Sequence, residues 1–246
     1  MPEQTNKQPI AIRRIASPRP AAPPNQWFLG LDFGQRQDHS ALAAFELTWD
    51  FVNRCPLYLT YGYTPKITLR RLRRYPLGVQ YEELREKIID EIRRDFAPFA
   101  PLDLVIDAGG PGIPNVEFLR ASLGALIRVH PVMITSGTDV TQLKGGFKGI
   151  PRNHLISRLL LTMSAGTMEL DDDLKLGDLF EEELASLDSA TGHPAAGGHD
   201  DLVIAGSLGL HWGLIVAPEL LPAHQPDRDE AESSGTKYGF KDKPLF

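Results

Sequence analysis

Two short, mostly apolar segments of this 246-residue chain each end on an aspartate that is closely followed by glycine. Residues 27–31 precede Asp32, and residues 102–106 precede Asp107. Apolar residues at consecutive rather than alternating positions are typical of a strand buried on both faces. The sequence therefore predicts two central strands of an α/β sheet, each with a carboxylate at its end.

The other expected elements follow from hydrophobic periodicity and turn residues. A short connection over residues 35–39 predicts a hairpin into a second strand. The further strands are expected over residues 40–48, within 57–64, and over 67–75, 127–135 and 166–170. Helices are expected over residues 80–96, 115–123, 151–165 and 179–187. The last of these helices is acidic, and Glu181, Glu182 and Glu183 are interpreted as its solvated face.

Composition limits the class of protein. Residues 1–25 are rich in proline and arginine, which predicts a disordered arm. We expect one domain over residues 26–217 and a flexible acidic tail over 218–246. The single cysteine, Cys55, excludes an internal disulfide and a cysteine-built zinc site. No apolar run approaches the roughly 20 residues of a membrane span, so we expect a cytoplasmic protein without a membrane partner.

A third acidic motif, His199-Asp200-Asp201, precedes a long apolar run that predicts a buried helix. An aspartate at a helix start can cap backbone N–H groups. Capping accounts for one aspartate, but it does not account for two beside a histidine.

Acids at these three places suggest a metal site. Ligands gather outside the carboxyl ends of strands in open α/β sheets. Clustered carboxylates repel one another, and these motifs contain no lysine or arginine, so a divalent cation is the natural counter-charge. Oxygen-only ligands favour Mg²⁺ or Mn²⁺. Two such ions about 4 Å apart can support phosphodiester cleavage.

The order of elements, with acids on the first and fourth strands and on a late helix, resembles the RNase H-like (retroviral-integrase) fold. More narrowly, the chain from about Trp27 to Trp212 resembles the nuclease domain of the large terminase subunit of tailed bacteriophages. The segments that carry this resemblance are WFLGLDFGQRQDHSALAAFE, LDLVIDAGGPG, IPRNHLISRLL, LFEEELASL and GHDDLVIAGSLGL. The resemblance implies a mixed five-stranded sheet flanked by helices.

The same resemblance implies a divalent-metal-dependent endodeoxyribonuclease that uses two Mg²⁺ or Mn²⁺ ions during DNA packaging. Asp32 would bridge both ions, Asp107 would bind one, and an aspartate of the pair Asp200 and Asp201 would complete the site, with Asp200 favoured. His199 could assist a leaving group or have a structural role. Asp38 is a peripheral candidate.

Candidate contacts to double-stranded DNA come from two segments. Alternation in residues 67–75 places Arg71 and Arg73 on one face of a strand, although an exposed edge strand kept soluble by charge would show the same pattern. The glycine-rich segment 136–149 carries Lys144 and Lys148, and it is either a substrate-facing loop or an ordinary connection. The net charge of −6 argues against a protein that simply coats nucleic acid.

No GxxxxGK[ST] phosphate loop occurs in the chain, so the packaging ATPase domain of a full large terminase is not expected here. The expected partners are a separate packaging ATPase, a small terminase subunit or a portal, in a phage-infected or prophage-carrying bacterial host. Two alternatives remain open. One is an actin-like nucleotide-binding protein, whose architecture needs two lobes, and the other is a non-catalytic packaging module.

Overall fold

The computed structural model describes residues 21–34, 38–55, 60–109, 112–143, 147–188, 191–194 and 198–221. Its strands are β1 (Gln26–Asp32), β2 (Ala41–Cys55), β3 (Thr60–Arg74), β4 (Leu102–Asp107), β5 (Ile127–Thr135), β6 (Thr141–Gln142), β7 (Lys148–Pro151) and β8 (Met168–Leu170). Its α-helices are α1 (Tyr81–Glu91), α2 (Gly112–Leu123), α3 (Arg152–Ser164), α4 (Gly177–Ser186) and α5 (Asp201–Val216). Single turns η1 (Ile92–Phe96), η2 (Ala97–Phe99), η3 (Gly124–Leu126) and η5 (Pro218–Leu220) follow other elements. The arm expected over residues 1–25 and the tail expected over 218–246 lie largely outside the described residues.

The described strands form one mixed sheet in the order β6-β7-β5-β4-β1-β2-β3-β8. β1 pairs in parallel with β4 and antiparallel with β2, which in turn forms a long hairpin with β3. The predicted mixed α/β class is confirmed, but the sheet has eight strands rather than five in the described part of the chain. Of these strands, β8 corresponds to the strand expected over residues 166–170. β6 and β7 were not predicted, because two and four residues are too few to show a period-two pattern. The strands expected within 57–64 and over 67–75 are one continuous strand, β3.

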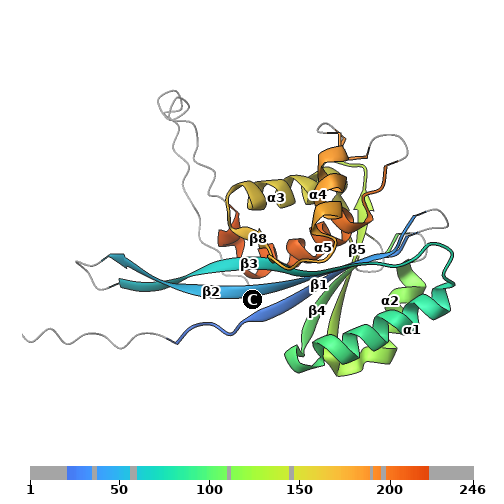
Figure 1. The fold of residues 1–246 in the computed structure, drawn as a ribbon, viewed down its shortest axis with the longest axis horizontal. Coiled ribbons are helices and arrows are strands. Elements are labelled where there is room, and N and C mark those ends of the chain that lie inside the picture. The colour runs from blue at the N-terminus through green and yellow to red at the C-terminus, as the bar shows by residue number, and fades with distance from the viewer. Residues whose placement is uncertain are drawn as a thin grey trace, which may run out of the picture.

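Helices cover both faces of the sheet. Figure 1 shows α1 and α2 on one face and α3, α4 and α5 on the other. The alternation of side chains along β1 divides the core accordingly. Phe28 packs with residues of α5, whereas Leu29 and Leu31 pack with residues of α1 and α2. Asp32, two residues beyond Gly30 and four beyond Phe28, therefore lies on the α5 face.

Helix α5 lies directly on β1 because both elements lack side chains where they cross. A Cβ atom at Gly30 would collide with the carbonyl oxygen of Ala205 and the amide nitrogen of Gly209. A Cβ atom at Gly209 would lie 2.8 Å from the Phe45 ring and 3.1 Å from the Gly30 nitrogen. Larger residues at this crossing would push the helix away from the strand.

The crossing also sets the register of the helix. Gly213 lies near Phe28, and Gly209 and Ala205 lie near Gly30, so α5 runs antiparallel to β1. Four residues of an α-helix span about 6 Å along its axis, and two residues of a strand span about 6.6 Å. The two elements therefore advance by nearly equal distances. The first turn of α5, which carries Asp201, therefore lies near the end of β1, and Asp201 and Asp32 line one cavity. Almost all of α5 is buried.

No helix in the described part of the chain is both long and apolar enough to cross a membrane.

We predict that Gly30→Ala destabilises the protein by about 3 kcal/mol, because the new methyl group meets helix backbone that cannot rotate away. Urea unfolding measures the change. Gly137→Ala is the matched control, since its Cβ would have no neighbour closer than 4.0 Å, and we expect a change within about 0.5 kcal/mol. Equal stability of the two variants would contradict the close helix–strand contact.

Candidate active site

The two strand-end acids lie side by side. β1 and β4 pair in parallel with Leu31 opposite Ile106, so the next residues, Asp32 and Asp107, end neighbouring strands at the same level. The Oδ1 atom of Asp107 accepts hydrogen bonds from the backbone N–H groups of Gly109, at 2.9 Å, and Ile134, at 3.4 Å. These bonds orient the Asp107 carboxylate.

All the predicted acids line one cavity of about 290 Å³. Asp32 and Asp107 enter it from the sheet, Asp200 and Asp201 from the start of α5, and Asp38 from the segment after β1. The structure therefore brings together the carboxylates that the sequence suggested. Asp38, the peripheral candidate, is among them.

Burial makes the two strand-end acids, Asp32 and Asp107, difficult to ionise. Burial, followed by the charges of Asp107 and Asp201, raises the pKa of Asp32 well above its ordinary value. Burial also raises the pKa of Asp107, against the lowering effect of its two backbone hydrogen bonds. A carboxylate with a raised pKa in a cavity is a common mark of a functional site.

Two arginines that the sequence analysis did not assign to the site supply positive charge. Arg74, the last residue of β3, donates to Asp201 at 2.8 Å and lies 3.3 Å from Glu183. Arg152, the first residue of α3, lines the cavity and forms an ion pair with Asp200. The acidic motifs themselves contain no lysine or arginine, but cations from distant segments of the chain lie beside the acids and supply part of the counter-charge.

Glu183 caps the helix that carries the aspartates. Its Oε2 atom accepts hydrogen bonds from the backbone N–H groups of Leu202, at 2.9 Å, and Val203, at 3.2 Å. Asp200 stands at the N-cap position of α5 but makes no capping bond. The interpretation of Glu183 as solvated was wrong, since it is 4% exposed. Because Glu183 does the capping, the carboxylate of Asp200 is not needed for that role.

The auxiliary histidine also lies at the site. The Nδ1 atom of His199 is 3.8 Å from Asp201 Oδ2, and its ring meets that of His39 edge to face at 5.5 Å. His199 is thus placed beside the acids.

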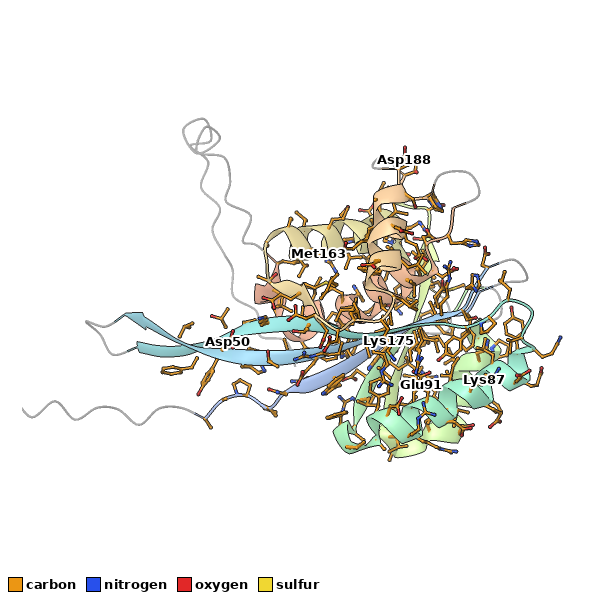
Figure 2. The ribbon with its side chains drawn as sticks, in the orientation of Figure 1. Asp50, Lys87, Glu91, Met163, Lys175 and Asp188 are labelled. Atoms are coloured by element: carbon orange, nitrogen blue, oxygen red, sulfur yellow. The ribbon has the colours of Figure 1, made fainter. Side chains whose placement is uncertain are left out.

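The predicted DNA contacts lie away from the acidic cavity. Arg71 and Arg73 share a face of β3, as expected, and both form ion pairs with Glu91 of α1, at 3.7 Å and 2.9 Å; Figure 2 shows Glu91 in this helix layer. Arg71 also pairs with Asp95. Lys148 is exposed on β7 and lines a separate cavity of about 460 Å³. Lys144 lies outside the described residues.

The donor set fits a divalent cation in its chemistry. Carboxylate oxygens from three elements face one cavity, and the buried Oδ2 atom of Asp200 has no hydrogen-bond partner. The described residues contain no group of three or more His, Cys, Asp or Glu side chains close enough together to hold a metal. Arg74 and Arg152 contact two of the four acids, so Asp201 and Asp200 are engaged with arginine in this arrangement.

Comparison with solved structures identifies the fold. The terminase nuclease domain of human cytomegalovirus, soaked with Mn and with an inhibitor bound, is 12% identical to this chain with a TM-score of 0.50, over 80% of this chain and 87% of that one. This chain has a terminase nuclease fold. The large terminase nuclease of the thermophilic phage G20c is 18% identical, with a TM-score of 0.44, over 76% of this chain and 82% of that one. The nuclease domain of the bacteriophage SPP1 large terminase, with bound Mn, is 14% identical, with a TM-score of 0.39, over 76% and 86%.

No protein-family model matches this sequence, and a search of curated proteins gives no match. At 12% identity, the similarity to the cytomegalovirus domain establishes the fold alone. The chemistry must therefore be argued from the residues that line the cavity.

We predict that Asp32→Asn stabilises the protein at pH 7 in EDTA, by roughly 0.5–2 kcal/mol. Folding raises the pKa of Asp32 above its ordinary value of 3.8, so the folded state binds this proton more tightly, and stability is lost as the pH rises above 3.8. The neutral amide removes this loss, and the advantage should vanish towards pH 4.

Thermal unfolding across this pH range measures the effect. The control is Asp171→Asn, because Asp171 pairs with Arg70 on the outer part of the sheet and its pKa is lowered, chiefly by that hydrogen bond. The control should show no gain at pH 7. A parent protein as stable at pH 7 as Asp32→Asn would show that the acids do not repel one another.

Proposed function

We propose that this protein is a divalent-metal-dependent endodeoxyribonuclease of the terminase type, which hydrolyses phosphodiester bonds with two Mg²⁺ or Mn²⁺ ions during DNA packaging. One observation carries the proposal: Asp32, Asp107, Asp200 and Asp201 converge on a single cavity in a terminase nuclease fold. Metal ions bound there would activate water and stabilise the leaving oxygen.

The carboxylates have distinct roles in this proposal. Asp32 stands centrally between the acids of β4 and α5, and it is the proposed bridging ligand. Asp107 is a second ligand, already oriented by two backbone N–H groups. Asp200 is the favoured third ligand, because Asp201 is 4% exposed and receives a hydrogen bond from Arg74.

Neighbouring groups hold this arrangement. Arg74 joins Asp201 to Glu183, and Glu183 fixes the first turn of α5. His199 lies beside Asp201 and is a candidate to orient that acid or to protonate a leaving group. These residues act on the ligands and need not contact the substrate.

Double-stranded DNA is the proposed substrate, and a separate packaging ATPase, a small terminase subunit or a portal is the proposed partner. The cytoplasm of a phage-infected or prophage-carrying bacterium is the proposed location. The described residues form one sheet covered on both faces. An actin-like protein needs two lobes, so this arrangement favours the nuclease.

We predict that the purified protein nicks or linearises supercoiled plasmid with Mn²⁺ or Mg²⁺, and that EDTA abolishes the reaction. Asp32→Asn and Asp107→Asn should each reduce the rate at least about a hundredfold, as expected when a group that stabilises transition-state charge is removed. Asp171→Asn should cut at the parent rate. If Asp32→Asn cleaved the plasmid as fast as the parent, the acids would have no role in the mechanism.

We further propose that Arg71 and Arg73 contact the DNA backbone. Because each already pairs with Glu91, we expect a modest contribution from each. The double variant Arg71→Gln, Arg73→Gln should weaken binding to a duplex and reduce the slope of log K against log salt by about 1–2. Fluorescence anisotropy over a salt series measures the slope, and an unchanged slope would assign both arginines to structural ion pairs.

A further inference from the structure

Arg152 lies inside the acidic cavity because of local structure at the start of α3. β7 ends at Pro151, and Arg152 is the next residue. Its Nε atom donates a hydrogen bond to the carbonyl oxygen of Gly192, at 2.9 Å. The backbone of a turn far along the chain therefore holds the guanidinium group in position, and only 15% of this side chain is exposed.

The guanidinium group faces the carboxylate that is the favoured third metal ligand. Arg152 and Asp200 form an ion pair, and the Asp200 side chain is only 17% exposed. Neither the paired nitrogen of Arg152 nor Asp200 Oδ2 makes a hydrogen bond with proper geometry. The contact is therefore electrostatic. Another cation can take the place of the guanidinium group without the loss of a directional hydrogen bond.

Arg74 provides an internal comparison. It donates a well-formed hydrogen bond to Asp201 and lies between that acid and the capping Glu183. Its pairing holds the start of α5 together. Among the described residues, Arg152 forms its ion pair with Asp200, and its positive charge also lowers the pKa of Asp32. The two arginines therefore differ: Arg74 holds structure, whereas Arg152 neutralises the acids that would receive a metal.

We propose that Arg152 is a resident cation that competes with divalent metal for Asp200, and so sets the metal concentration at which the site fills. This inference rests on the proposed nuclease function. A guanidinium group and a metal ion cannot occupy the same side of one carboxylate oxygen. A metal ion that binds Asp200 at Oδ2 would therefore displace Arg152, and part of the binding free energy would be used for that displacement.

The test measures Mn²⁺ binding without DNA, by isothermal titration calorimetry of the parent, Arg152→Gln and a control. We expect Arg152→Gln to bind Mn²⁺ about tenfold more tightly, or more, since a hydrogen bond or contact to a charged group contributes enough for such a factor. The control is Arg128→Gln. Arg128 makes a bidentate pair with Asp103 at the opposite end of β4 from Asp107, and its loss should leave Mn²⁺ affinity unchanged.

A second measurement guards against damage to folding. In EDTA, Arg152→Gln should melt below the parent because its acids have lost a counter-charge, and added Mn²⁺ should raise its melting temperature more than it raises that of the parent. Arg152→Lys keeps the charge and should bind Mn²⁺ with an affinity nearer to that of the parent.

The outcomes separate the two proposals. Mn²⁺ binding by the parent, with equal or weaker binding by a folded Arg152→Gln, would overturn the competition and leave the nuclease proposal intact. Tighter binding by Arg128→Gln as well would also overturn it, because the effect would then be one of general charge. No Mn²⁺ binding by any variant or by the parent would overturn both proposals.

Discussion

The contact between Gly30 and Gly209 is the constraint on which the site depends. With no side chain on either residue, α5 lies directly against β1. From one close contact to the next, the helix advances by four residues while the strand advances by two. This register places the start of α5 over the end of β1, so the aspartates of the helix meet those of the sheet. Small residues in the middle of the apolar run thus determine the position of acids one and two turns away.

The cost of this arrangement is electrostatic. Several carboxylates share one cavity. Burial raises the pKa values of Asp32 and Asp107, and the charges of neighbouring acids raise the pKa of Asp32 further. The fold offsets part of this repulsion with arginines from two other elements, β3 and α3. Functional sites commonly retain such unfavourable clusters because the ligand supplies what the protein lacks. In the proposed nuclease, the missing charge would be that of a divalent cation.

The features that could be predicted from the sequence are those encoded by long apolar runs. β1 and β4 are buried on both faces, so their composition predicted both strands and the position of Asp32 and Asp107 at their ends. The short strands β6 and β7 were missed because two and four residues show no period. Arg152 and Arg74 were missed for another reason: a charged residue at the end of a strand has the same local sequence whether it faces solvent or a cavity. Glu183 was misread beside two other glutamates, although Phe180, three residues earlier, marks the buried face of α4.

The central claim is that the carboxylates of β1, β4 and α5 form one divalent-metal site. Anomalous diffraction from crystals soaked in Mn²⁺ tests this claim most directly, because it locates the ions without reference to activity. The account predicts anomalous peaks in the cavity between Asp32, Asp107 and Asp200, with the Arg152 side chain moved away from Asp200. Crystals with full exposure to Mn²⁺ but no peak in this cavity, or with peaks only at other acidic residues, would contradict it.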